Sequence, residues 1–350
     1  MSDSLRIAVV GAGMIGRRHI ELVRAGPECV LAAIADPAPA AEALAADAGV
    51  PHYASLESLL TAARRVDGII LATPNALHAA QALQCIAAGI PVLVEKPVAH
   101  TVEAGAALCD AVERSHARLL VGHHRRHSAI MARACEVVAS RALGPLVAVM
   151  GSALFYKPDH YFDEAPWRRE PGGGPVLINM IHEIDNLRAL CGEIAGVQAL
   201  ASSARRGFPV EDTVAINLRF ASGALGTFML SDTAASARSW EQTSRENKSY
   251  ASYPDEDCYL IAGTDGSLAI PTMRLRRYPR AEDRSWWQPF DTRVLAVENV
   301  DPLARQLWHF CAVIGGSARP LVTARDGLQN LVITEAIVKA ARTGRAVATA

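Results

Sequence analysis

The chain lacks several features that mark whole classes of protein. No apolar run reaches the length of about 18 residues that a membrane-spanning helix needs, so we expect no membrane association. The formal net charge is only −1. Nucleic-acid-binding proteins usually carry a basic excess, and we therefore expect no nucleic-acid partner. The first four residues form neither the basic segment nor the apolar stretch of a secretion signal, which favours a cytoplasmic protein.

Paired cysteines are also missing, and lysine is scarce. The seven cysteines are an odd number and form no Cys-x-x-Cys pair. Neither a zinc knuckle nor a disulfide framework is indicated, and a reducing compartment is expected. Of the 35 basic residues only four are lysines, namely Lys96, Lys157, Lys248 and Lys339. Because lysine, unlike arginine, can lose its proton in a protein, each persistent lysine is a candidate for chemistry.

The 350 residues, half of them hydrophobic, are enough for two domains. In the first 122 residues, short apolar runs alternate with helical patterns. Strands are expected at 5–10, 30–35, 68–71, 92–94 and 119–121, and helices at 14–25, 39–48, 76–88 and 102–115. Such alternation predicts a parallel sheet covered on both faces. We therefore expect a doubly wound Rossmann domain over residues 1–124.

After residue 127 the pattern changes to strands without intervening helices. Helices are expected at 128–141, 176–190, 302–314 and 325–341, and strands at 146–156, 197–204, 213–220, 224–231, 259–262 and 273–278, with a polar loop over 232–257. Consecutive strands joined by short glycine turns favour an antiparallel sheet. Residues 125–350 are therefore predicted to form an α/β domain with a largely antiparallel sheet.

A glycine loop, Gly11-Ala12-Gly13-Met14-Ile15-Gly16, joins the first expected strand to the first helix. Its first glycine permits a tight turn, its second lets the backbone approach a pyrophosphate, and its third lets the helix pack on the strand. The N–H groups of the helix N-terminus would face the phosphates. The loop therefore predicts a dinucleotide-binding site, to which Gly11, Gly13, Met14, Ile15 and Gly16 contribute.

Asp36 ends the second expected strand, twenty residues after Gly16. A carboxylate there can accept hydrogen bonds from both ribose hydroxyls and would repel a 2′-phosphate. No lysine or arginine lies between Arg24 and Arg64 to offset this charge. NAD is therefore favoured over NADP as the cofactor.

Two further motifs follow buried strands at the edge where ligands bind in parallel sheets. They are Thr73-Pro74-Asn75, followed by His78, and Glu95-Lys96-Pro97. These two motifs occur together with the glycine loop, with residues 122–126, and with the triple glycine 172–174 that precedes His182 and Asp185. This combination resembles the glucose–fructose oxidoreductase/inositol dehydrogenase (Gfo/Idh/MocA) family. The resemblance covers nearly the whole chain. It implies that Thr73, Pro74, Asn75, His78, Glu95 and Lys96 bind the cofactor.

Lys96 has a physical case of its own. It follows a buried strand at the place expected for the nicotinamide, where an ammonium can hold a substrate oxygen and stabilise developing negative charge. The alternative is a surface lysine that pairs with Glu95. The resemblance implies that Lys96 belongs to the active site. The sequence leaves open whether the Lys96-Pro97 bond is cis.

The helix expected at 176–190 has an apolar and a polar side at about 100° per residue. The polar side carries Asn179, His182, Glu183, Asp185 and Asn186. An imidazole can remove a hydroxyl proton near neutral pH, and a neighbouring acid can set its tautomer. A solvated helix face is the alternative interpretation.

The resemblance makes His182 the catalytic base. Many relatives carry an aspartate four residues before this histidine, where this chain has Ile178, so a Lys–His pair replaces the usual triad. Asn179 is the nearest polar substitute and can orient a substrate hydroxyl. The resemblance also places Asp185 and Lys157 at the substrate.

Weaker candidates surround these residues. His123, His124 and His127, with two arginines between them, could form a cation cluster, but no metal is expected. Arg168 could contact a polar or anionic substrate, or lie in a solvated loop.

Taken together, these patterns predict an NAD-dependent oxidoreductase that transfers a hydride between the nicotinamide and a secondary hydroxyl of a sugar, sugar derivative or cyclitol. The alternatives are an NAD-retaining glycosidase or epimerase of the same fold, and a non-catalytic NAD-binding regulatory protein. By resemblance, a homodimer or homotetramer would form through the C-terminal sheet.

Overall fold

The computed structural model describes residues 4–62 and 65–349. Residues 1–3, on which the argument about a secretion signal depended, and Arg64 lie outside the described residues. Two compact units are present. The first comprises residues 1–127 and 302–331, and the second comprises 128–301 and 332–350. The expected domain bounds, 1–124 and 125–350, remain a prediction. In the structure, residues 302–331 also pack with the N-terminal part of the chain.

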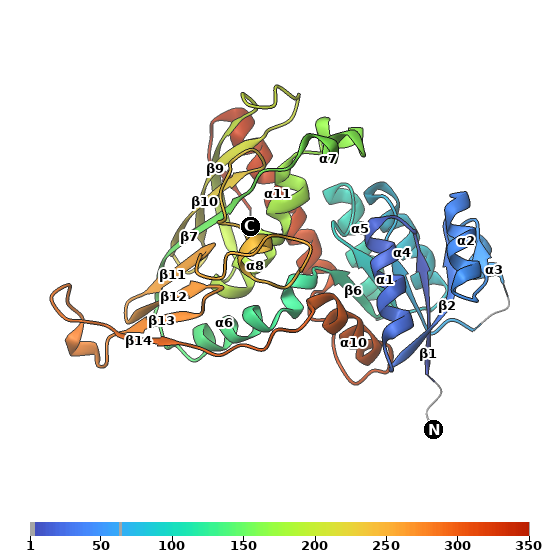
Figure 1. Cartoon of the computed structure of the whole chain (residues 1–350), viewed down its shortest axis with the longest axis horizontal. Helices are drawn as coiled ribbons and strands as arrows, with labels where there is room; N and C mark the ends of the chain where they lie inside the picture. The colour runs from blue at the N-terminus through green and yellow to red at the C-terminus, as the bar shows by residue number, and fades with distance from the viewer. Residues whose placement is uncertain (1–3, 63–64, 350) are drawn as a thin grey trace. The chain divides into compact units, whose positions relative to one another are not determined.

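The described part of the first unit contains a six-stranded parallel sheet with the order β3-β2-β1-β4-β5-β6 (Figure 1). Its strands are β1 (Leu5–Val10), β2 (Cys29–Ala35), β3 (His52–Tyr53), β4 (Gly68–Leu71), β5 (Val92–Glu95) and β6 (Leu119–Gly122). Its helices are α1 (Met14–Ala25), α2 (Pro39–Asp47), α3 (Leu56–Thr61), α4 (His78–Ala87), α5 (Val102–Ser115) and α10 (Pro302–Ile314). The chain leaves β1 toward β2 on one side and returns to β4 on the other, which creates a topological switch point. Ligands of doubly wound sheets bind there.

Helix α10 joins the core of this unit although it lies near the other end of the chain. Leu307, Phe310 and Ile314 pack with the buried residues Ile7 and Ile70 of the sheet. The apolar spacing of α10 presents one stripe to the sheet, as expected for an amphipathic helix. The expected helix 302–314 is confirmed, but its partner could not be read from its own sequence.

The described part of the second unit contains a nine-stranded mixed sheet with the order β14-β13-β12-β11-β7-β10-β9-β8-β15. The strands are β7 (Leu146–Leu154), β8 (Ile194–Ser202), β9 (Thr213–Phe220), β10 (Leu225–Ser231), β11 (Tyr259–Gly263), β12 (Gly266–Ile270), β13 (Arg274–Arg277), β14 (Asp291–Val294) and β15 (Val347–Ala348). Within the described strands, only β7 and β10 pair in parallel. The predicted largely antiparallel sheet is therefore confirmed.

Helices cover one face of this sheet, and the other face is exposed. The helices of this part are α6 (Ala129–Ala139), α7 (Asp159–Asp163), α8 (Ile181–Cys191), α9 (Trp240–Thr243) and the C-terminal part of α11 (Ala324–Thr343). Residues of α6, α8 and α11 share one apolar core with the inward side chains of the strands (Figure 1). Strand β12 was not expected, because its first residue, Gly266, was taken for a turn. Throughout the described residues, no helix is both long and apolar enough to cross a membrane.

Candidate active site

The glycine loop has the backbone that a dinucleotide site requires. Gly11 has a φ of +94°, and a Cβ there would lie 2.5 Å from the carbonyl oxygen of Ala72. A Cβ on Gly16 would lie 1.9 Å from the Gly11 oxygen, so no larger residue fits. By contrast, a Cβ on Gly13 would meet nothing within 4 Å. Gly13 precedes α1 without a side-chain cap. No side chain of the cap residue therefore accepts from the first N–H groups of α1. These N–H groups are left to bind an anion, as in other helix ends that bind phosphate.

Asp36 lies beside this loop at the end of β2, and both of its carboxylate oxygens are held by the main chain. Oδ2 accepts the N–H of Ala12 at 2.7 Å, and Oδ1 accepts the N–H of Ala38 at 2.8 Å. The ring of His52 contacts the Asp36 carbonyl oxygen at 2.8 Å. The carboxylate is thus fixed in orientation with lone pairs left for a ligand. The loop and Asp36 together fit the pyrophosphate and the ribose of a dinucleotide.

The segments that follow β4 and β5 lie at the same edge of the sheet, because the strands are parallel. His78 begins α4 and is 1% exposed. Its Nε2 lies 2.8 Å from the carbonyl oxygen of Thr73, and its Nδ1 lies 2.7 Å from that of Pro97. Thr73 also donates its hydroxyl to Gln81 at 2.7 Å. His78, which was expected to contact the cofactor, therefore joins the two strand-end motifs to each other.

Glu95 is the buried partner that precedes the candidate lysine. Its Oε1 lies 2.8 Å from Nε2 of His19 in α1, and its Oε2 accepts the Lys96 N–H at 3.3 Å. Burial opposes the charge of Glu95, but the hydrogen bond with His19 and the nearby Lys96 ammonium lower its pKa overall. Lys96 itself is half-buried, and the Lys96-Pro97 bond is cis.

The histidine-rich segment after β6 is mostly buried, since His123, Arg125 and His127 are each at most 6% exposed. Burial, reinforced by the charge of Arg125, lowers the pKa of His124 to about 3. Burial and the neighbouring His309 lower the pKa of His127 to about 3 as well. Both rings are therefore neutral at pH 7. In residues 4–62 and 65–349, no cluster of three or more His, Cys, Asp or Glu side chains has the arrangement of a metal site.

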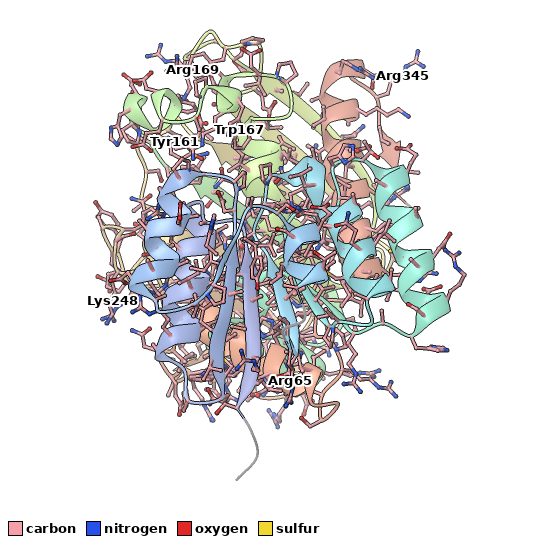
Figure 2. The ribbon with its side chains drawn as sticks, turned by 90° about the vertical axis from the view of Figure 1, so that its right-hand side faces the viewer. Arg65, Tyr161, Trp167, Arg169, Lys248 and Arg345 are labelled. Carbon is pink, nitrogen blue, oxygen red and sulfur yellow. The ribbon has the colours of Figure 1, made fainter. Side chains whose placement is uncertain are left out.

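In the second unit, Lys157 and Asn179 lie in contact. The Lys157 ammonium donates to Oδ1 of Asn179 at 2.7 Å and lies 4.9 Å from the centre of the Tyr161 ring. The Arg168 guanidinium lies 3.7 Å from the centre of the same ring and donates to the Tyr161 carbonyl oxygen. Figure 2 labels Tyr161 and its neighbour Trp167 on this segment. Two of the predicted substrate residues, Lys157 and Arg168, thus lie against one aromatic ring, and a third, Asn179, is hydrogen-bonded to Lys157.

The pair of residues that supports Lys157 was not predicted from the sequence. Arg206 is buried, binds Oδ1 of Asp232 through its Nε at 2.8 Å, and donates to the Lys157 carbonyl oxygen at 2.8 Å. Asp232 lies 3.9 Å from the Lys157 ammonium. Burial raises the pKa of Asp232, and Arg206 and Lys157 oppose this shift. In the sequence, Arg206 follows another arginine in a polar stretch that looks like solvated surface, so no local signal marks it.

His182 lies in the first turn of α8, directly after a π-helical turn over Val176–Met180. The polar side of this helix is buried, so the interpretation as a solvated face is wrong. Glu183 is fully buried and accepts the hydroxyl of Tyr259, to which Asn186 also donates at 3.1 Å. Glu183 and Asn186 therefore serve the core, while His182 and Asp185 remain the candidates for chemistry.

The comparisons with known proteins agree with this description. Residues 5–123 match a family model described as an oxidoreductase family with an NAD-binding Rossmann fold. Residues 131–269 match the model of the GFO/IDH/MocA C-terminal domain. The two matches follow one another along the chain and together cover well over half of it.

Individual proteins resemble the whole chain or a large part of it. The 1,5-anhydro-D-fructose reductase of Ensifer adhaerens is 29% identical over 353 residues, which cover 97% of each chain. An inositol 2-dehydrogenase of Arthrobacter sp. (strain FB24) is 32% identical over 216 residues, or 60% of this chain and 61% of that enzyme. The structure of the WlbA dehydrogenase from Bordetella pertussis, in complex with NADH and UDP-GlcNAcA, matches with a TM-score of 0.78 and 26% identity, and covers 99% of this chain and 98% of that one.

Proposed function

The chain belongs to the Gfo/Idh/MocA family of oxidoreductases, and we propose that it oxidises a secondary hydroxyl of a sugar, sugar derivative or cyclitol to a ketone, or catalyses the reverse. Similarity to an anhydrofructose reductase and to inositol 2-dehydrogenases supports this substrate class. The observation that carries the proposal is the position of Lys96. It follows β5 at the sheet edge that also carries the glycine loop, Thr73 and Asn75.

The cofactor proposed is NAD rather than NADP. The glycine loop and α1 would hold the pyrophosphate, Asp36 would accept the ribose hydroxyls, and the segments 73–75 and 95–96 would line the nicotinamide end. NADH in the related WlbA structure supports this proposal. When bound, NAD supplies the hydride acceptor for the oxidation.

The proposed roles of the side chains follow from their chemistry. Lys96 holds the substrate oxygen and stabilises the negative charge that develops on it. His182 takes the hydroxyl proton as the general base. Asn179, Asp185, Lys157 and Arg168 bind the other polar groups of the substrate. The contact between Lys157 and Asn179 supports a shared binding role for these two side chains.

A substrate panel tests the proposal directly. The protein is incubated with NAD and with each member of a set of sugars, sugar acids and inositols, and NADH formation is followed by absorbance, with mass analysis of the products. We expect NADH and a ketone in equal amounts from at least one compound. Products without net NADH would indicate an NAD-retaining glycosidase or epimerase, and NAD binding without any product would favour a regulatory protein.

We also propose that the exposed face of the second sheet joins copies of this chain. Met150, Leu200 and Leu225 are each more than half exposed on strands β7, β8 and β10. The same face contains a shallow depression of about 570 Å³ lined by residues of these strands and of β9. Large exposed apolar side chains gathered on one face of a sheet are typical of interaction surfaces. Light scattering should show a dimer or tetramer for the wild type and smaller species for Leu200→Asp. The matched variant Leu321→Asp, at an exposed leucine elsewhere, should leave the mass unchanged.

A further inference from the structure

Lys96 lies between two residues that are each held by a buried histidine. Glu95, before it, contacts His19, and Pro97, after it, contacts His78. Both histidines are 1% exposed. They come from different helices of the first unit, His19 from α1 and His78 from the start of α4. The main chain on both sides of the lysine is therefore fixed from two directions.

The two carboxylate oxygens of Glu95 have different partners, His19 and the main chain of Lys96. Nε2 of His19 lies 2.8 Å from one carboxylate oxygen of Glu95, and the other oxygen accepts the Lys96 N–H at 3.3 Å. Gly122 of β6 keeps the space for this carboxylate, because a Cβ there would lie 2.9 Å from the Glu95 carboxyl carbon. Glu95 thus transmits the position of α1 to the main chain of Lys96. Charge-assisted hydrogen bonds of this kind are the stronger ones in proteins.

The contact with His78 uses both ring nitrogens. Nδ1 faces the Pro97 carbonyl oxygen at 2.7 Å, and Nε2 faces the Thr73 carbonyl oxygen at 2.8 Å. Carbonyl oxygens only accept, so the ring can donate to either of them from a protonated nitrogen. His78 therefore ties the segment after Lys96 to the segment that follows β4.

We propose that His19 and His78 are positioning residues for Lys96, an inference that rests on the proposed role of this lysine. A lysine side chain is long and flexible, so its ammonium is placed within a narrow volume only if its main chain is fixed. Displacement of a reacting group by about 1 Å can cost roughly a hundredfold in rate. Since α1 begins at the glycine loop, His19 also links the dinucleotide-binding helix to the lysine.

Each ring nitrogen can be tested separately with amide side chains. The side-chain amide nitrogen of glutamine is the same number of bonds from Cα as Nε2 of histidine. The side-chain amide nitrogen of asparagine is the same number of bonds from Cα as Nδ1 of histidine. At position 19, where Nε2 makes the contact, His19→Gln should keep Lys96 in place and His19→Asn should release it. At position 78, where Nδ1 contacts Pro97, His78→Asn should keep it and His78→Gln should release it.

The scarcity of lysine gives a readout that does not depend on a substrate. Reductive methylation with ¹³C-formaldehyde labels the four lysines and the N-terminal amine, and Lys96→Arg assigns the signal of Lys96 in the NMR spectrum. We expect His19→Asn and His78→Gln to move the Lys96 signal toward the position of a mobile lysine and to reduce its shift on addition of NADH at least twofold. The signals of Lys157, Lys248 and Lys339 should stay, and serve as internal controls for folding.

Steady-state kinetics complete the test. With any substrate found in the panel, each releasing variant should have a kcat about tenfold lower than the retaining variant at the same position, while the Kd for NADH differs less than threefold within each pair. His309→Leu, which removes another histidine of the same unit, should have neither effect. If glutamine and asparagine behave alike at both positions, the proposal is overturned. If Lys96→Ala keeps full turnover, the proposed function of Lys96 fails instead, and the NMR result still decides whether the histidines hold it.

Discussion

Replacement of Asp36 by asparagine should abolish the preference for NADH over NADPH. The side chain keeps its size, but the charge that repels a 2′-phosphate is lost. In the wild type this carboxylate is held by the N–H groups of Ala12 and Ala38 at 2.7 and 2.8 Å, so it cannot turn away from the ribose position. No lysine or arginine between Arg24 and Arg64 offsets it.

The size of the effect follows from Coulomb's law. A 2′-phosphate carries a charge of about −1.5 to −2 near pH 7. At about 5 Å in a water-like medium, one carboxylate repels it by about 1.2 to 1.7 kcal/mol. Asp36 is half-buried, so solvent screens it less than at an open surface, and the repulsion is at least this large. Since about 1.4 kcal/mol corresponds to tenfold in Kd, the wild type should prefer NADH by at least about tenfold.

Isothermal titration with both reduced cofactors measures this preference. For Asp36→Asn the two Kd values should agree within about threefold. NADH binding should also weaken by about tenfold, because an amide can accept from only one of the two N–H groups with its oxygen. Asp47→Asn is a matched control, since Asp47 is exposed and pairs with Arg24 at 3.0 Å. Equal affinities in the wild type, or an unchanged preference in Asp36→Asn, would refute the argument.

Three further predictions concern catalysis and stability. Lys96→Ala should lower turnover by roughly a hundredfold and leave the Kd for NADH within a few-fold, and a mutant with wild-type turnover would return Lys96 to a structural role. His182→Ala should remove the acidic limb of the pH–rate profile, whereas Asn179→Ala should mainly raise KM; an acidic limb that survives in His182→Ala would assign the base to another group. The pKa of His127 is lowered to about 3, so the unfolded chain binds this proton at a higher pH than the folded chain, and stability is lost as pH falls below about 6.5. Urea titrations between about pH 6 and 4 measure the free energy of unfolding, which should fall by about 1.4 kcal/mol less per pH unit in His127→Gln than in the wild type. The control His100→Gln, at an exposed histidine, should follow the wild type. Identical slopes for His127→Gln and the wild type would contradict this prediction.

Local patterns in the sequence were sufficient for the fold class and for the backbone geometry of the glycine loop. The alternation of strands and helices predicted the parallel sheet, because period and length are properties of each segment alone. The glycine loop could be read because Gly11 and Gly16 are required by backbone geometry at those positions. Asp36 and Lys96 could be placed at one sheet edge because the carboxyl ends of parallel strands share it.

The partners of these residues were decided only by the tertiary structure. His19 meets Glu95 across 76 positions of sequence, and Arg206 meets Asp232 across 26. No period of 2 or 3.6 residues encodes such contacts, because they depend on how whole elements pack. The same holds for Glu183, whose polar neighbours suggested a solvated face, while the packing of α8 places it against Tyr259 in the core. Sequence therefore indicated which side chains are candidates for the chemistry, and packing decided which buried groups hold them in place.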